Sequence, residues 1–399
     1  MVRRSRSDDH MMWGYLALAT MSHTLTHTFV NTQLALVPIL QGELGLSIEL
    51  VSLMVTIPTL AQALLYVPSG ILSDRFRPDR LVSLSLLLAA LGGLVITQSQ
   101  TSLMLVFGFC IIGGCLAIYH PSAYSIISEL FESRRRNVAL GIHGAGGTLG
   151  MAVGPISVGL VMYFLGQSNW RMTYLLWAFP ALGCLLVVTI LKPKSKEGLA
   201  VRDSSSGIAQ ELSSFRSVFA LPYLAFLVLV GVQNFGVQAV STYMTTYLKE
   251  VQGLPVDYAS ILFGGISLMG LIAAPIGGIL ADKMGERSVL IVAYLGQAVS
   301  LACITLSSNL ILLVPFVFAY GFTEYLSMAP MSALVVRFTP RGRRGIGYAT
   351  YFLSSTFAAV VAPLAGALVI SGWGVRYVFP MSICVFIAAA AMLGLIIKK

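Results

Sequence analysis

Four histidines lie inside long apolar stretches of this sequence, where ionisable side chains are costly and usually have a function. His23, His27 and Asn31 follow one another at intervals of four, so they share one face of a helix. His120 and His143 lie in two further apolar stretches. Because imidazole titrates near neutral pH, the four histidines are candidates for proton binding, with hydrogen-bonded packing as the alternative.

Glu324 is the acidic residue that we place deepest in an apolar stretch. An ionised carboxylate at the centre of a bilayer costs about 2.5 to 3.5 kcal/mol. Glu324 must therefore face a water-filled cavity or be protonated, which suits a group that takes up and releases a proton. The alternative is a neutral structural carboxyl group hydrogen-bonded to Tyr320 or Ser327.

We expect no metal and no cofactor. His23 and His27 have a spacing that zinc ligands use, but no acidic residue or cysteine nearby in the sequence completes such a site. The five cysteines lie in apolar stretches without a CxxC pattern. A phosphate-binding Gly-x-x-x-x-Gly-Lys-Ser/Thr loop is absent from the sequence, so ATP is not the predicted energy source.

The elements that hold these residues are membrane helices. Of the 399 residues 57% are hydrophobic and only 10% are charged, which is too little polar surface for a soluble protein of this size. Runs long enough to cross a bilayer predict an all-α membrane protein with twelve transmembrane helices. The predicted spans are 12–40, 49–72, 81–97, 103–128, 138–165, 171–191, 218–248, 258–281, 288–306, 310–336, 345–371 and 375–397.

A pattern that occurs twice, 208 positions apart, indicates an internal duplication. Gly70-Ile-Leu-Ser-Asp74-Arg75 matches Gly278-Ile-Leu-Ala-Asp282-Lys283, and Gly154-Pro155 matches Ala362-Pro363. Such repeats are typical of transporters. We therefore predict an N-terminal six-helix bundle over 1–191, a cytoplasmic linker over 192–217 and a C-terminal six-helix bundle over 218–399, the two bundles being pseudo-symmetric.

The basic residues predict the orientation. Of the 25 Lys and Arg residues, 22 fall on one predicted side of the membrane, and only Arg171, Lys249 and Arg376 fall on the other. The positive-inside rule then places both termini in the cytoplasm. Because the net charge of +9 resides in the flanks of membrane spans, nucleic acid is not an expected partner.

The two six-helix halves, the central basic loop and the Gly-x-Leu-x-Asp-Arg pattern after the second and eighth spans resemble the major facilitator superfamily. His27-Thr-Phe-Val-Asn31 and Tyr119-His120-Pro121-Ser-Ala123 resemble the fosmidomycin-resistance group of drug exporters. Asn31 stands where that group is expected to have Asp, so a proton carried by that Asp in relatives must be carried here by another group. The resemblance implies a multi-pass protein of the prokaryotic inner (plasma) membrane that works as a monomer.

The duplicated loops are candidates for a cytoplasmic latch between the halves. Gly70 allows close helix approach, and Asp74 is expected to face the positive start of the eleventh span. Asp282 is expected to face the start of the fifth span. The alternative is that these charges only terminate helices. The latch candidates are Gly70, Asp74, Arg75, Arg134, Arg135, Arg136, Asp282, Arg341, Arg343 and Arg344.

The fifth span combines the features of a packing helix and of a gate. Gly146, Gly150 and Gly154 are four residues apart and suit a close helix contact, and Pro155 introduces a potential kink. Gly150, Gly154 and Pro155 also follow much of the Gly-Pro motif of antiporters, with Val158 where a second Gly is usual.

Neutral polar residues outline a substrate cavity. Asn234, Gln238 and Thr242 repeat at intervals of four on the seventh span, the counterpart of the first. Transporters built from such repeats bind substrate near the midplane of the bilayer. The candidates for lining the cavity are Asn31, Tyr119, Asn234, Gln238, Thr242, Tyr320 and Tyr351.

These features predict a secondary active transporter of a small organic molecule that works by alternating access, most simply as proton-coupled export. A membrane receptor that transports nothing would be indicated by a sealed cavity and no flux, and two further alternatives remain open. One is uptake or facilitated diffusion of a small solute without proton coupling. The other, of a different class, is an intramembrane lipid-modifying enzyme, which the repeat and the latch make unnecessary; we therefore expect no enzymatic activity.

Overall fold

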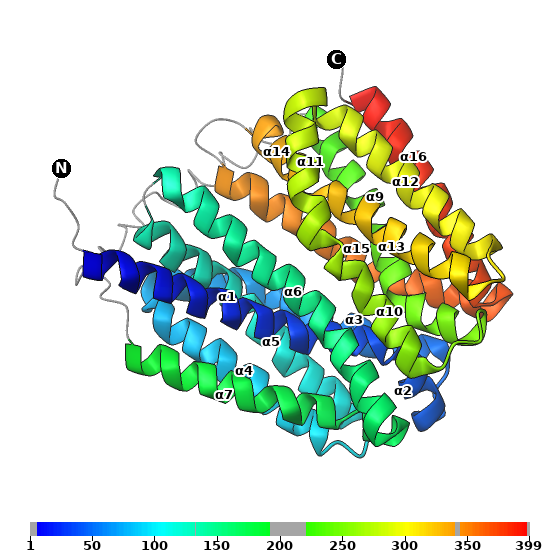
Figure 1. Cartoon of the computed structure of the whole chain (residues 1–399), viewed down its shortest axis with the longest axis horizontal. Helices are drawn as coiled ribbons and strands as arrows, with labels where there is room; N and C mark the ends of the chain where they lie inside the picture. The colour runs from blue at the N-terminus through cyan, green and yellow to red at the C-terminus, as the bar shows by residue number, and fades with distance from the viewer. Residues whose placement is uncertain (1–5, 132, 192–220, 340–343, 397–399) are drawn as a thin grey trace. The chain divides into compact units, whose positions relative to one another are not determined.

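The computed structural model describes residues 6–131, 133–191, 221–339 and 344–396, and within these ranges it is helical without β-strands (Figure 1). The chain divides into two compact units. Unit 1 comprises Met1–Gln33 and Ile57–Asp203, and unit 2 comprises Leu34–Thr56 and Ser204–Lys399. Segment 34–56 therefore packs with the second half of the chain. The predicted linker 192–217 lies outside the described residues.

Unit 1 is built from six long helices. They are α1 (Arg6–Ala35), α3 (Ile48–Arg75), α4 (Pro78–Thr97), α5 (Ser102–Leu130), α6 (Ser133–Leu165) and α7 (Met172–Leu191). In Figure 1, α4 lies beside α5 and α7, with which it shares extensive contacts. Thr101 caps the start of α5, where its side chain accepts a hydrogen bond from the Met104 amide.

Among the described residues, unit 2 contains nine helices, together with the first residues of α3. They are α2 (Val37–Leu44), α9 (Leu221–Glu250), α10 (Val256–Leu268), α11 (Gly270–Met284), α12 (Glu286–Leu306), α13 (Leu310–Leu326), α14 (Met328–Phe338), α15 (Arg344–Trp373) and α16 (Val378–Ile396). The short helix α2 directly precedes α3 in the chain. Its core gathers buried side chains of α9, α12, α14 and α16. Two predicted spans are interrupted: α10 and α11 are separated at Met269, and α13 and α14 at Ser327.

Eleven helical segments of the described chain are long and apolar enough to cross a membrane, and their bounds agree with the predicted spans to within a few residues. The first predicted span, 12–40, corresponds to α1 followed by the turn into α2. At 30 residues α1 is long enough to cross a membrane, but its His, Thr and Asn side chains make it more polar than the other spans.

The duplication is visible in the backbone. Gly45 and Gly253, which are 208 positions apart, have φ of 60° and 70°, and Gly166 and Gly374, with the same separation, have φ of 92° and 97°. Residues other than Gly rarely adopt this conformation. Gly166 and Gly374 are each followed by a short 3₁₀ turn, Gln167–Asn169 and Val375–Tyr377. Equivalent turns thus join equivalent helices in the two halves of the sequence.

Helix packing repeats with the same offset. A Cβ atom on Gly113 of α5 would lie 2.8 Å from the Pro58 carbonyl oxygen, and one on Gly321 of α13 would lie 2.5 Å from the Ile266 carbonyl oxygen. Gly321 lies 208 positions after Gly113, and Ile266 lies 208 positions after Pro58. Each glycine lets two helices approach at backbone distance.

Segment 34–56 is held in unit 2 by polar contacts to α9 and α15. The Ser52 and Tyr243 hydroxyl groups are 2.6 Å apart, and Tyr243 donates a hydrogen bond to the Pro363 carbonyl oxygen. Ser371 donates a hydrogen bond to the Glu49 carboxylate. No pattern in the sequence predicts these contacts.

Candidate functional site

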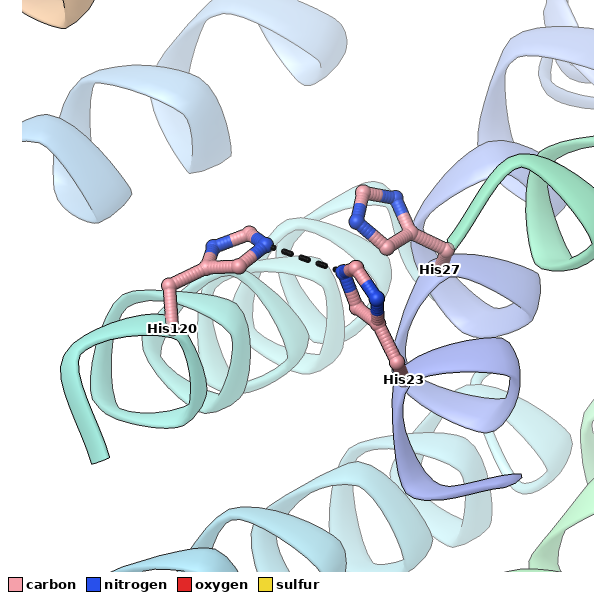
Figure 2. Close-up of side chains that lie close together, drawn as sticks. All are labelled: His23, His27 and His120. Atoms are coloured by element: carbon pink, nitrogen blue, oxygen red, sulfur yellow. Dashed lines mark hydrogen bonds between the residues drawn. The ribbon is translucent and has the colours of Figure 1, made fainter. Parts of the chain in front are cut away.

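The four intramembrane histidines meet inside unit 1, although they come from three helices. His23 and His27 lie one turn apart on α1, His120 lies on α5 and His143 on α6. Figure 2 shows the rings of His23, His27 and His120 pointing toward one another. His23 and His27 are buried, and His120 is partly buried. The four-residue spacing on α1 correctly placed two of the rings on one face, and the fold adds the other two.

The ring of His23 is at the centre of this histidine cluster. Its Nδ1 atom is 2.7 Å from the His143 carbonyl oxygen, and its Nε2 atom is 3.3 Å from Nε2 of His120. The ring stacks on that of His143, with 4.2 Å between centroids and an interplanar angle of 11°. The centroid of His27 is 4.7 Å from that of His23 and 5.5 Å from that of His120.

Glycines of α6 make room for the cluster. A Cβ atom on Gly147 would lie 2.5 Å from the His23 ring, and one on Gly150 would lie 2.2 Å from the Thr24 carbonyl oxygen and 2.8 Å from the His27 Cβ. Gly146 and Gly154 approach the α1 backbone in the same way, at Thr20 and Thr28. The regularly spaced glycines Gly146, Gly150 and Gly154 therefore lie on the face of α6 that packs against α1. Whether these residues and Pro155 also act in gating stays a prediction.

Hydrogen-bond chemistry fixes one tautomer in the cluster. A carbonyl oxygen can only accept, so His23 donates from Nδ1, and its Nε2 carries a lone pair when the ring is neutral. Among the described residues, Nδ1 of His27 and both ring nitrogens of His143 are buried without a hydrogen-bond partner. Unpaired buried polar atoms are rare and costly, so each of these nitrogens calls for a further hydrogen-bond partner, such as a water molecule or a ligand.

In unit 2, Glu324 lies near the end of α13 and is half-buried. The Ser327 amide and hydroxyl group donate to the Glu324 backbone carbonyl, 3.2 and 2.6 Å away, where the helix is interrupted. Tyr320, one turn earlier, lies beside the carboxyl group. Oε2 of Glu324 has no hydrogen-bond partner among the described residues. The sequence predicted a neighbouring Tyr320 and Ser327, but it did not predict the helix break.

A second helix break lies against the first. The Tyr325 hydroxyl group donates to Oγ of Ser267, 3.1 Å away and just before the break at Met269. A Cβ atom on Gly277 of α11 would lie 2.2 Å from the Leu326 carbonyl oxygen. Signals in the sequence are Gly270, directly after Met269, and Pro330, three residues after Ser327.

The predicted cavity residues are divided between the units. In unit 1, Asn31 donates to the His27 carbonyl oxygen, and buried Tyr119 donates to that of Ala19 and stacks on His23. In unit 2, Asn234 donates to the Val230 carbonyl oxygen and Thr242 to that of Gln238, each one turn earlier on α9. Two aromatic candidates are also in unit 2: Tyr320 is buried, and Tyr351 packs against the core.

The latch stays a prediction. Arg341 and Arg343 lie outside the described residues, and the side chains of Asp74, Arg134 and Arg344 are not described. Of the remaining latch candidates, Arg75, Arg135 and Asp282 have exposed side chains. The Arg136 side chain donates a hydrogen bond to the Phe131 carbonyl oxygen, 3.2 Å away. Gly70 has open space where a Cβ atom would stand.

Comparison with known proteins agrees with this architecture. The family model of the Major Facilitator Superfamily matches residues 16–272 and 253–399. The Fosmidomycin resistance protein of Escherichia coli (strain K12) is 23% identical over 291 residues, which cover 72% of this chain and 69% of that protein. The multi-drug resistance efflux pump PmrA of Streptococcus pneumoniae serotype 4 is 24% identical over 93% of each chain.

The fold is also that of solved transporters. The crystal structure of a bacterial homologue of the human lysosomal transporter Spinster, inward-facing and unoccupied, superposes with a TM-score of 0.81, 15% sequence identity and 97% coverage of both chains. The match of the family model over nearly the whole chain, together with the membrane helices described above, shows that this chain belongs to the Major Facilitator Superfamily and is a multi-pass membrane transporter rather than an enzyme.

Proposed function

We propose that the protein is a proton-coupled exporter that exchanges protons for a small organic molecule by alternating access. The observation that carries this proposal is Glu324. Its carboxyl group lies within a membrane helix, and one of its oxygens is buried without a hydrogen-bond partner among the residues that the structure describes. An acid in this setting is costly when ionised, so its charge must depend on what surrounds it. Protonation of Glu324 then biases which side of the transporter is open.

The histidine cluster supports the same proposal. Four imidazoles in membrane helices supply further groups that exchange protons near neutral pH. Asn31 replaces the acid expected on α1, so proton uptake in this chain falls to Glu324 together with the histidines. The similarity to a fosmidomycin resistance protein and to an efflux pump favours export of a drug or metabolite.

The substrate class follows from the charges in the helices. The sequence places no Lys or Arg deep in a predicted span, so no permanent cation is offered to a multiply charged anion. A neutral, weakly anionic, zwitterionic or cationic amphiphile fits better. The neutral hydrogen-bonding side chains of α1 and α9 would contact it. The basic flanks place both termini in the cytoplasm, and the duplicated loops act as the cytoplasmic latch.

Proton flux in liposomes tests the proposal. Purified protein is reconstituted with a pH-sensitive dye inside, and fosmidomycin or the lipophilic cation ethidium is added as the probe. We expect probe-dependent proton movement in the wild type and its loss in Glu324→Gln. Glu286→Gln is the matched control, because this carboxylate lies outside the site, 3.7 Å from Arg337.

The outcomes separate the alternatives. Probe movement that is unaffected by a pH gradient would indicate facilitated diffusion. Proton movement in the same direction as the probe would indicate uptake by symport. Equal proton flux in the wild type and in Glu324→Gln would remove Glu324 from the mechanism.

A further inference from the structure

We propose that His23, His27 and His120 form a binding site for a divalent transition-metal ion of the zinc class. The site lies entirely within unit 1, between α1 and α5 (Figure 2). Each ring offers one nitrogen, and the three nitrogens lie within 4.8 Å of one another. The sequence analysis expected no metal because no third ligand was near in the sequence, and the fold supplies one from a position almost one hundred residues away.

The distance between the His23 and His120 nitrogens fits tetrahedral coordination. Ligand nitrogens about 2.0 to 2.1 Å from zinc are about 3.3 Å apart when the angle between them is tetrahedral. The Nε2 atoms of His23 and His120 are separated by 3.3 Å. These two nitrogens thus already span one edge of a coordination tetrahedron. The three nitrogens lie within 4.8 Å of one another, so the His27 nitrogen must move closer to the other two to share a tetrahedral ion.

The hydrogen bonds around the rings also suit a metal. Metal-binding histidines typically donate their other N–H to a backbone carbonyl or carboxylate, which fixes the tautomer. His23 does so through Nδ1 to the His143 carbonyl oxygen, 2.7 Å away, and thereby directs the Nε2 lone pair at His120. His27 is nine-tenths buried, and its Nδ1 has no partner among the described residues.

The ligand set selects the class of ion. Three imidazole nitrogens without a carboxylate in the cluster suit zinc and its neighbours, and they do not suit the oxygen-seeking ions Mg²⁺ and Ca²⁺. Three protein ligands leave a fourth position for water, hydroxide or an anion. A bound anion would also offset the charge of the ion in the membrane.

The metal site is independent of the proposed exporter function. Imidazole binds metal only when deprotonated, so protons and metal compete for the cluster. Binding at equilibrium nevertheless requires neither a substrate nor a pH gradient. A chain that binds zinc without proton-coupled flux would refute the proposed function alone, and the reverse result would refute the metal site alone.

Metal titration tests the site. Tag-free protein in detergent is titrated with Zn²⁺ against a chromophoric chelator, and with Co²⁺, whose visible absorption is intense when the ion is four-coordinate. We expect one ion per chain. We expect His27→Gln and His120→Gln to lower the zinc affinity more than about 100-fold, because removal of even a second-sphere partner costs 10- to 100-fold.

The matched control is Thr28→Val, an isosteric change on α1 next to His27 whose hydroxyl group donates only within its own helix to the Thr24 carbonyl oxygen. It should keep the affinity within about twofold. X-ray absorption at the zinc edge of the wild type, which requires no variant, should show three imidazole ligands. Zinc that binds equally well to all variants, or a spectrum without imidazole, would overturn the proposal.

Discussion

The two units use one duplicated scaffold for two different kinds of chemistry. Positions 208 residues after His23, His27 and His120 are occupied by Gly231, Phe235 and Met328, none of which is ionisable. Conversely, the position in unit 1 that corresponds to Glu324 is Leu116, one turn before His120. The histidine cluster and the carboxyl group therefore lie at similar levels of their units, and neither has a counterpart in the other.

The surroundings of the two sites differ as much as their chemistry. In unit 1, the rings extend from continuous helices, and a backbone carbonyl and ring stacking hold His23 in place. In unit 2, Glu324 lies at the end of a helix that is interrupted at Ser327. A group of imidazole lone pairs on continuous helices suits a cation that must be held, whereas a carboxyl group where two helices meet suits a charge that is coupled to movement.

Both sites depend on a glycine that allows backbone contact. Gly150 of α6 approaches the Thr24 carbonyl between the two histidines of α1, and Gly277 of α11 approaches the Leu326 carbonyl just after Glu324. In each case a Cβ atom would stand 2.2 Å from a carbonyl oxygen, far inside contact distance. The missing side chains of Gly150 and Gly277 therefore allow the close helix packing that positions the histidines of α1 and Glu324 of α13.

The largest expected effect is a reciprocal loss of the two activities. Glu324→Gln should abolish probe-dependent proton flux and leave the zinc affinity within about twofold, since the carboxyl group is not part of the metal site. His27→Gln should lower the zinc affinity more than about 100-fold and reduce proton flux less than Glu324→Gln does. Both variants are measured in both assays. Parallel losses in the two assays would show that the two regions act as one site.

Next in size is Gly150→Ala, which should destabilise the protein by about 3 kcal/mol, because two backbones must separate. The same shift moves the carbonyl group that holds His23, so zinc affinity should fall as well. The measurement is equilibrium unfolding in mixed SDS micelles. Gly144→Ala is the control, since nothing lies within 4 Å of its Cβ position. Equal stabilities of the two variants would contradict the close packing of α6 on α1.

Gly277→Ala should have a smaller effect, about 2 kcal/mol, because α13 ends at Leu326 and the break can absorb part of the displacement. Unfolding and proton flux are both measured. The adjacent Gly278→Ala should be near neutral, since its Cβ would meet only the Cβ of Ala329 at an ordinary 3.6 Å. If Gly278→Ala proves the more harmful of the pair, the assigned face of α11 is wrong.

The smallest effect concerns the hydrogen bond between the two helix breaks. Tyr325→Phe and Ser267→Ala each remove one partner of the 3.1 Å contact. A double-mutant cycle of unfolding free energies should give a coupling of about 1 kcal/mol, the usual net contribution of a hydrogen bond. Strictly additive effects would show that the contact contributes nothing to joining α10 with α13.

Much of the architecture could be predicted from the sequence. Apolar runs gave the membrane helices because each helix must satisfy its own backbone hydrogen bonds in lipid, which makes the signal local. The repeat offset of 208, found in short motifs, reappears in positive-φ glycines and in helix contacts that the motifs do not include. The breaks at Met269 and Ser327 escaped prediction because the hydrophobic signal continues through them.

The site could be predicted only in part. The spacing of four between His23 and His27 fixed their common face, because helical periodicity is a property of the chain itself. That His120 comes within 3.3 Å of His23, and that the third possible metal ligand exists at all, depends on how α5 packs against α1. The sequence thus determined which groups lie in the membrane, and the tertiary structure decided which of them meet, since contacts between helices depend on side-chain packing that no local pattern records.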